Sequence, residues 1–239
     1  MWEGAKVIDI HSHVLPFVDD GSRSMEESLK MLSELRNQGV KHVILTPHKR
    51  YDFNISREEI AERFLVFKKE VESQGIDIKL YLGREIYISP EKGLDFLQEC
   101  LTLNDTKYLL IEFRFVQDDD VDVVDISYEL VRNGYIPIIS HIERYPYLTE
   151  YNVEEIRAVG AKIQVNAESI VSGKAKRFRK KVRNLLKRRL VDFVASDIHF
   201  GRENCIQKAY NYVAKKISKE YADQVFTLNA QDIIGEKTV

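Results

Sequence analysis

Residues 8–21 of the chain read IDIHSHVLPFVDDG, a short apolar run that leads into two histidines and ends in paired aspartates and a glycine. In a β-strand, alternate side chains leave on the same face, so His11 and His13 are expected to point the same way, with Asp9 before them on that face. Two imidazoles side by side at a strand end form either half of a metal site or an unusual piece of core. The remaining strands of the chain distinguish these alternatives.

Strand-like runs alternate with amphipathic helical patterns along the whole chain. Several of the runs are nearly all apolar, which is typical of strands buried on both faces of a parallel sheet. Strands are predicted at residues 6–11, 41–48, 78–87, 107–113, 135–141, 161–169 and 191–199. Helices are predicted at residues 25–39, 56–75, 121–133, 152–159, 175–189 and 203–219. This alternation predicts an α/β fold with βαβ units in a closed or nearly closed barrel, and an open doubly wound sheet is the alternative.

Length and composition are those of one globular α/β domain. The chain has 239 residues and no linker-like or low-complexity stretch, so we expect a single domain over residues 1–239. A net charge of −2 gives no reason to expect nucleic acid as a partner. We find no signal-peptide pattern and no apolar run near the length of a membrane span, about 18 residues. With only Cys100 and Cys205, we expect a reduced cytoplasmic protein without a disulfide framework.

Metal-type ligands occupy the carboxyl ends of the predicted strands, where α/β folds place their chemistry. A single histidine at such a place is more often structural, but five of the six histidines of the chain lie at strand ends. His42, at the opposite end of its strand, is interpreted as structural. The polar residues at or just beyond strand ends are His11, His13, Asp19, Asp20, His48, Glu85, Glu112, His141, Asp197 and His199.

A set of eight or nine imidazole and carboxylate ligands indicates more than one metal ion. A catalytic ion takes about three or four protein ligands, so this set suits two or three ions. Mixed imidazole and carboxylate ligands favour manganese, iron or zinc over calcium, and they contain too few oxygens for a magnesium cage. Isolated carboxylates are rarely buried in apolar strands without a partner or a metal. The pattern therefore predicts a metal-dependent hydrolase.

Two arginines, each of which follows one of these histidines, indicate the class of reaction. Arg144 lies three positions after His141, and Arg202 lies three positions after His199. The planar guanidinium matches a phosphate group, and clustered metal ions can hold the attacking and leaving oxygens of a phosphoryl transfer. An ordinary surface arginine is the alternative interpretation of each, above all of Arg202.

The chain carries the motifs HSHVLPFVDDG, TPH, GREIY, LNDTKYLLIEF, PIISHIERY and VASDIH in this order. They resemble the motifs of the polymerase and histidinol phosphatase (PHP) superfamily. Within it, they are similar to the bacterial capsule and exopolysaccharide branch of manganese-dependent tyrosine-protein phosphatases. The resemblance covers nearly the whole chain. It implies a distorted (β/α)7 barrel of the PHP type with two or three divalent ions, Mn²⁺ before others, at its mouth.

The resemblance also implies which residues hold each ion. The first ion would be bound by His11, His13, Glu85 and Asp197. Glu85 would bridge to a second ion, which is completed by Glu112 and His141. The third ion would be bound by Asp20, His48 and His199. Of the two adjacent aspartates, the motif points to Asp20 as the ligand and leaves Asp19 outside the set.

Catalytic residues and a substrate follow from the same resemblance. Arg144 matches the phosphate-binding arginine of the family, whereas Phe200 and a shortened spacer leave the role of Arg202 open. His199 is also a candidate proton donor to the leaving phenolate. The implied substrate is phosphotyrosine on the tyrosine-rich tail of a membrane-associated bacterial tyrosine kinase that controls polysaccharide export. This partner would place the cytoplasmic protein at the inner face of the membrane.

Three other functions were weighed. A cysteine-dependent tyrosine phosphatase needs an arginine six positions after its cysteine, and the chain has Thr106 and Asn211 there. A histidinol phosphatase or another small-molecule phosphoesterase of the same superfamily shares the ligand set, so the ligands do not exclude it. A catalytically silent regulatory barrel that binds a kinase through its surface would be favoured by missing ligands, and none is missing.

Two charged segments have both a structural and a functional interpretation. Residues 118–129 have acidic groups at several calcium-loop positions, but Val123 replaces the turn glycine, so we predict a helix with an acidic N-terminus. Residues 174–189 hold ten basic residues in sixteen, and an apolar face of Phe178, Val182, Leu185 and Leu186. We predict an amphipathic helix with its basic face in solvent. Docking of an acidic kinase tail or an anionic lipid surface is the alternative.

Overall fold

Parallel β-strands form the centre of the protein, which we describe from a computed structural model covering residues 6–53, 55–88, 94, 97, 100–117 and 121–235. Every pairing between the strands of these residues is parallel. The strands are β1 (Val7–Ser12), β2 (Val40–Leu45), β3 (His48–Lys49), β4 (Lys79–Leu82), β5 (Glu85–Tyr87), β6 (Tyr108–Glu112), β7 (Ile136–Ile139), β8 (Lys162–Asn166) and β9 (Phe193–Ala195).

Two of the predicted strands are each interrupted once. The run predicted at 41–48 becomes β2 and β3, separated at Pro47, and the run predicted at 78–87 becomes β4 and β5, separated at Gly83 and Arg84. Since proline has no N–H to donate, it interrupts the ladder there. The pairing order is β1-β2-β4 in one sheet and β3-β5-β6-β7-β8-β9 in the other. Each of the seven predicted strands is therefore present, in sequence order around the barrel.

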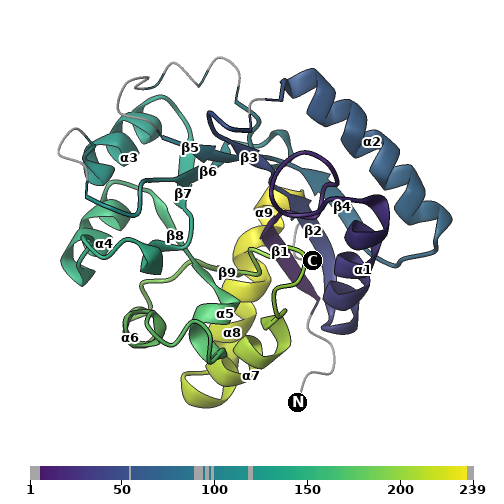
Figure 1. Ribbon diagram of the computed structural model, residues 1–239. Helices are drawn as coiled ribbons and strands as arrows, with labels where there is room; N and C mark the ends of the chain where they lie inside the picture. The colour runs from purple at the N-terminus through teal and green to yellow at the C-terminus, as the bar shows by residue number, and fades with distance from the viewer. Residues whose placement is uncertain are drawn as a thin grey trace.

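Hydrogen bonds beyond the regular strands join the first strand to the last. The N–H of Asp197 donates to the carbonyl of His11 at 2.9 Å, and the N–H of His13 donates to that of Ile198 at 3.1 Å. Asp9 accepts from the N–H and the hydroxyl of Ser196, so its carboxylate also joins the first strand to the turn after the last. The strands thus curl into a barrel with helices outside (Figure 1), and the predicted distorted (β/α)7 barrel is confirmed.

Helices cover the outside of the barrel, and buried apolar side chains fill the space between them and the strands. A smaller cluster, which includes Ile10, Leu110 and Ile233, fills the interior below the strand ends. The helices of the described residues are α1 (Met25–Asn37), α2 (Arg57–Ser73), α3 (Val123–Arg132), α4 (Glu150–Ala158), α5 (Ala167–Val171), α6 (Arg179–Lys187), α7 (Ile206–Lys216), α8 (Lys219–Phe226) and α9 (Gln231–Ile234). No helix among these residues is both long and apolar enough to cross a membrane.

Several predicted boundaries are wrong. The strand predicted at 161–169 ends at Asn166, because α5 begins at Ala167. A short apolar run has no clear period, so its pattern does not separate strand from helix. The helix predicted at 175–189 begins only at Arg179, and no side chain caps its first turn. The helix predicted at 203–219 is shorter, α7 at Ile206–Lys216, and a helix that was not predicted, α8, follows from Lys219.

The acidic segment at 118–129 contains the start of a helix, as predicted, although residues 118–120 lie outside the described residues. The Asp122 carboxylate accepts hydrogen bonds from the N–H groups of Val124 and Asp125, at 2.7 and 3.1 Å. Such a cap satisfies N–H groups that have no partner within the helix. The segment is therefore a helix N-terminus.

The basic helix α6 packs on the barrel through its apolar face, as predicted. Val182, Leu185 and Leu186 are buried. The predicted exposure of its basic face is wrong for Lys181, whose ammonium donates to the carbonyls of Ile142 and Tyr145 at 3.1 and 2.7 Å. Burial lowers the pKa of Lys181 to about 8. This side chain therefore holds the turn after β7 in place.

Leu185→Ala should destabilise the protein, because it removes a fully buried side chain from the contact between α6 and the barrel. We expect a loss of about 2–5 kcal/mol in the free energy of unfolding, measured by urea denaturation. Lys187→Ala, on the exposed side of the same helix, should change it by less than about 0.5 kcal/mol. Equal stability of the two variants would show that the apolar face of α6 is not part of the core.

Candidate metal centre

All nine predicted metal ligands surround one space at the carboxyl ends of the strands. Asp20, in the loop after β1, has a half-exposed side chain, and the other eight residues are buried. Seven of the nine, all but His141 and Asp197, fall into three overlapping groups whose ligand atoms lie within 4.8 Å of one another. The groups are His11, His13 and Glu85; His48, Glu85 and Glu112; and His13, Asp20, His48 and His199.

The first group centres on two histidine nitrogens that face each other. The Nε2 atoms of His11 and His13 are 3.1 Å apart. Glu85 Oε2 lies 3.3 and 3.4 Å from these two nitrogens. Asp197 Oδ1 lies 3.5 and 3.4 Å from them. The four residues that the resemblance implies for the first ion are therefore in contact.

Glu85 connects the first group to the second. Its Oε1 lies 3.0 Å from His141 Nε2, and its Oε2 lies 3.0 Å from His48 Nδ1. Glu112 faces the same two histidines, at 3.6 Å from His141 Nε2 and 3.7 Å from His48 Nδ1. Glu85 therefore lies between the residues implied for the first ion and those implied for the second.

The third group lies at the outer edge of the space. Asp20 Oδ1 is 3.5 Å from both His48 Nε2 and His199 Nε2. His48 therefore presents its two ring nitrogens to different groups. The predicted set of Asp20, His48 and His199 comes together, and His13 lies within the same group.

Three of these histidines are oriented through their second ring nitrogen. His11 Nδ1 lies 3.2 Å from Gln164 Oε1, His13 Nδ1 lies 2.7 Å from Asp19 Oδ2, and His199 Nδ1 lies 3.0 Å from the Asp197 carbonyl. Since each partner is an acceptor, each Nδ1 donates. Each Nε2 then has its lone pair toward the centre. Histidines that bind metals usually have such a partner.

Two of the supporting residues, Gln164 and Asn166, were not identified from the sequence. They lie on β8 and face the centre: Gln164 Nε2 donates to Asn166 Oδ1 at 2.8 Å, and Asn166 Nδ2 donates to Asp197 Oδ2 at 2.7 Å. Their signal is the pair of amides at alternate positions of the otherwise apolar QVN run. Such a pair in a buried strand needs polar partners inside the barrel.

Unsatisfied buried atoms show that the site suits cations. His11 Nε2 and His13 Nε2 face each other beside carboxylate oxygens. Burial opposes a charge on these imidazoles, yet the carboxylates raise the pKa of both, so the space between them favours positive charge. Glu85 Oε2, Glu112 Oε2 and His141 Nδ1 are buried and form no hydrogen bond. Buried polar atoms without partners are costly. Divalent cations satisfy such lone pairs, so the residues fit a cluster of these ions.

The pKa shifts of the buried groups agree with a site that requires additional positive charge. Burial and the neighbouring Glu85 raise the pKa of Glu112. Burial opposes ionisation of Glu85 as well, but His11 and His48 lower its pKa below the usual range. Burial lowers the pKa of His141 to about 4, which keeps its imidazole neutral and able to bind a cation.

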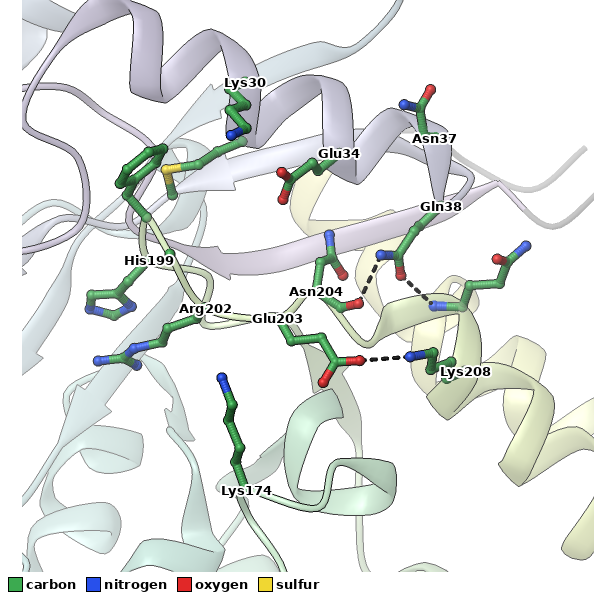
Figure 2. A pocket seen from close by; sticks show the side chains of 14 residues that line it. Lys30, Glu34, Asn37, Gln38, Lys174, His199, Arg202, Glu203, Asn204 and Lys208 are labelled. Atoms are coloured by element: carbon green, nitrogen blue, oxygen red, sulfur yellow. Dashed lines mark hydrogen bonds and ion pairs between the residues drawn. The ribbon is translucent and has the colours of Figure 1, made fainter.

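Both predicted arginines reach the carboxylate of Asp197. Arg144 Nη2 lies 2.8 Å and Arg202 Nη1 lies 3.9 Å from Asp197 Oδ2. The short HFGR spacer still brings Arg202 to the site, because Arg202 N–H donates to the His199 carbonyl and Gly201 has a φ of +81°. Positive φ at this position of a tight turn favours glycine. Figure 2 shows that the side chains of His199 and Arg202 project together.

The barrel and the ligand cluster at its mouth define a metal-dependent hydrolase of the PHP type. The chain belongs to the CpsB/CapC family of capsular polysaccharide synthesis proteins, because the model of that family matches residues 7–235. It is 36% identical to the tyrosine-protein phosphatase CpsB of Streptococcus pneumoniae over 98% of this chain and 100% of that protein. It is 31% identical to the tyrosine-protein phosphatase YwqE of Bacillus subtilis, over 98% of this chain and 93% of that protein.

Solved structures agree with this family. The chain is similar to a crystal structure from work on YwqE of Bacillus subtilis and CpsB of Streptococcus pneumoniae, which are described as metal-dependent tyrosine phosphatases. The TM-score is 0.87, and the identity is 28% over 97% of this chain and 96% of the other. A histidinol phosphate phosphatase from Lactococcus lactis has a TM-score of 0.58 at 14% identity, over 87% of this chain and 93% of that one. This second similarity shows a shared fold.

Asp19→Asn should weaken metal binding, because it removes the negative charge that orients His13 through its Nδ1–H. We expect the affinity for Mn²⁺ to fall by about 10- to 100-fold. Titration of Mn²⁺ into chelator-treated protein measures this affinity. Asp77→Asn, an exposed aspartate paired with Lys41, serves as the matched control. An unchanged Mn²⁺ affinity in Asp19→Asn would contradict the orienting role.

Proposed function

We propose that this protein is a metal-dependent phosphatase that hydrolyses phosphotyrosine in proteins and acts in capsular or exopolysaccharide synthesis. The observation that carries the proposal is the cluster of buried imidazole and carboxylate ligands, joined through Asp197 to two arginines. The names of the relatives and the similar crystal structure support the same activity. We propose further that residues 1–239 act as a single domain.

We infer that two or three divalent ions, Mn²⁺ foremost, occupy the three groups of ligands. His11, His13, Glu85 and Asp197 would hold the first ion, Glu85, Glu112 and His141 the second, and Asp20, His48 and His199 the third. Because His48 presents its Nδ1 to Glu85, it also lies within reach of the second ion. When bound, such ions supply positive charge for the phosphoryl oxygens and lower the pKa of water toward neutrality.

Arg144 is the residue that we assign to the phosphate group. Its side chain is 24% exposed, so the guanidinium is fixed by Asp197 yet accessible from the mouth of the barrel. Asp197 in turn is held by Asn166, which leaves the arginine with one preferred orientation. A guanidinium placed in advance stabilises the charge that redistributes over the phosphoryl oxygens in the transition state. Arg202, on the same carboxylate, is proposed as the second phosphate-binding arginine.

His199 suits a metal ligand better than a proton donor. Its Nδ1–H is already donated to the Asp197 carbonyl, and its Nε2 faces Asp20 with a lone pair. Burial and the neighbouring His13 lower its pKa, so the imidazole is neutral. A phenolate, with a pKa of about 10, is also a leaving group that needs little help from a proton.

An exposed aromatic ring beside the site suits the aryl group of phosphotyrosine. The Phe115 ring is 42% exposed and lies 5.7 Å from the His141 ring. The guanidinium of Arg144 lies 5.9 Å from the same ring. Aromatic pairs are worth about 0.5–1.5 kcal/mol beyond their buried area. A phosphotyrosine whose phosphate meets Arg144 therefore has an aromatic surface next to it.

The partner that we propose is the phosphotyrosine-bearing tail of a membrane-associated bacterial tyrosine kinase. Such a partner would hold this protein at the cytoplasmic face of the membrane. A catalytically silent regulatory barrel is the second candidate. All of the predicted ligands converge, His141 and Asp197 through their contacts with Glu85 and His11, so nothing in the site favours it.

Removal and return of the metal tests the activity. We expect chelator-treated protein to lose phosphotyrosine hydrolysis and to regain it with Mn²⁺, and to hydrolyse phosphotyrosine in preference to histidinol phosphate. Metal content and the rates of phosphate release on both substrates are measured on one sample. Faster hydrolysis of histidinol phosphate would replace the proposed substrate with a small molecule. Turnover that survives full metal removal would contradict the metal-dependent reaction.

Arg144→Ala should lower the turnover of phosphotyrosine by about 100-fold or more, because it removes a preorganised donor to the phosphoryl group. Metal content should stay close to that of the unchanged protein, since Arg144 touches the proposed ligand Asp197 but, as a cation, would not itself bind a metal ion. Steady-state kinetics and metal analysis check the two expectations. Arg132→Ala, an exposed arginine on α3, is the control. Full activity of Arg144→Ala would show that its assigned role is wrong.

A further inference from the structure

A cavity lies beside the metal centre, on the side of the two arginines. Its volume is about 860 Å³, and we call it the Phe178 cavity. Ligand pockets usually measure about 300–1,000 Å³. Its walls come from Phe115 after β6, from Arg144 after β7, and from residues 174–178 before α6. A molecule bound at Arg144 can therefore extend into this cavity.

A second cavity of about 620 Å³ adjoins the first. It lies between α1, α7 and the turn after β9, and Lys174 and Arg202 line both cavities. Figure 2 shows the Lys174 side chain pointing toward the turn that carries Arg202 and Glu203. The recess therefore continues past Arg202, which suits a chain that runs across the site and not only a small ligand.

The Phe178 cavity has an excess of positive charge. The charged residues that line it are Arg144, Lys174, Arg177, Lys181 and Arg202, against Glu143 and Glu168. Glu143 is buried and accepts from the N–H of Asn166 at 3.0 Å. Lys181 donates to two backbone carbonyls. Apart from the two arginines at Asp197, Lys174 and Arg177 are therefore the exposed cations of the cavity.

These two cations face the cavity because α6 begins late. Residues 174–178 form turns, and only from Arg179 onward does the chain become helical. The Arg177 guanidinium lies 4.5 Å from the centre of the Phe178 ring, which is half-buried in the cavity wall. Glu203 lies near Lys174 but is paired with Lys208 at 2.6 Å. The cavity thus combines positive charge with aromatic surface.

We propose that the Phe178 cavity binds acidic side chains that flank the phosphotyrosine of a peptide substrate, with Lys174 and Arg177 as the residues that select them. The proposal rests on the proposed function, since it deepens the substrate class of the same site. A phosphate at Arg144 brings the neighbouring peptide residues to the cavity, because an extended chain advances only about 3.3 Å per residue. Complementary charge then favours acidic neighbours and speeds association.

An anionic membrane surface suits this cavity less well than a peptide. The cavity is a recess continuous with the phosphate-binding arginines, whereas a bilayer surface contacts cations that protrude. Exposed lysines such as Lys187 on α6 are not part of the lining of the recess. The cations of the cavity are therefore placed for a narrow chain that also reaches Arg144.

The test compares phosphotyrosyl peptides that differ only in glutamates or glutamines beside the phosphotyrosine. For the Mn²⁺-loaded protein we expect kcat/KM to be about tenfold higher for the acidic peptide at low salt, and the preference to shrink as salt screens the charges. In Lys174→Glu/Arg177→Glu the preference should disappear or reverse. The matched control Lys187→Glu/Lys215→Glu changes the net charge equally at exposed helix positions outside the cavity and should keep the preference.

Binding of the same two peptides with phosphonomethylphenylalanine in place of phosphotyrosine separates this proposal from the proposed function. Fluorescence anisotropy should show tighter binding of the acidic peptide, and the loss of this difference in Lys174→Glu/Arg177→Glu. A charge preference in binding without phosphotyrosine hydrolysis would contradict the phosphatase and keep the docking site. Hydrolysis with equal rates for both peptides would overturn the docking site alone. The docking site would also be overturned if Lys174→Glu/Arg177→Glu kept the peptide preference but lost binding to phosphatidylglycerol vesicles. The two cations would then bind a membrane.

Discussion

The buried carboxylate of Glu85 is the group around which the ligands are arranged. It lies 3.0–3.4 Å from nitrogens of His11, His13, His48 and His141, which come from three other parts of the barrel. An uncompensated buried charge costs several kcal/mol, so the position of Glu85 requires positive charge from protonated imidazoles or from bound cations. Burial opposes a charge on His11 and His13, but the neighbouring carboxylates raise the pKa of both imidazoles, so their protonation supplies part of this charge. Divalent cations in its place would meet the requirement for every residue around Glu85 at once.

The break between β4 and β5 is what aims Glu85 inward. Gly83, two residues before Glu85, packs so closely against Leu103 that a Cβ there would lie 2.6 Å from the Leu103 side chain. Arg84 is fully buried and donates to the carbonyls of Ile55 and His48, at 2.8 and 2.9 Å. His48 and Glu85 are also register partners of β3 and β5. The interruption of the ladder therefore places His48 and Glu85 side by side.

Sequence separation distinguishes the site residues that were predicted from those that were not. Strand ends could be located from local pattern, and parallel strands bring their carboxyl ends together, so the ten polar residues at these ends could be expected to meet. The choice of nine of them as ligands, with Asp19 left outside, came from the resemblance to the family. Gln164 supports His11 across a separation of 153 residues, and no local pattern predicts which strands become neighbours across a closed barrel. The late start of α6 was missed because residues 174–178 have good helical propensity. Only the absence of a side-chain cap and the tertiary contacts delay the start of the helix to Arg179.

The fold leaves the substrate open, because a histidinol phosphate phosphatase has a similar fold. The difference must then lie in residues that surround the ligands. Asp197 joins these two regions: its Oδ1 faces the histidines, and its Oδ2 holds Arg144. Around Arg144 the rim is aromatic at Phe115 and basic toward Lys174, which suits an aryl phosphate on a chain with negative charge. The cluster thus fixes the reaction at phosphorus, and the segments after β6 and before α6 select the molecule that carries it.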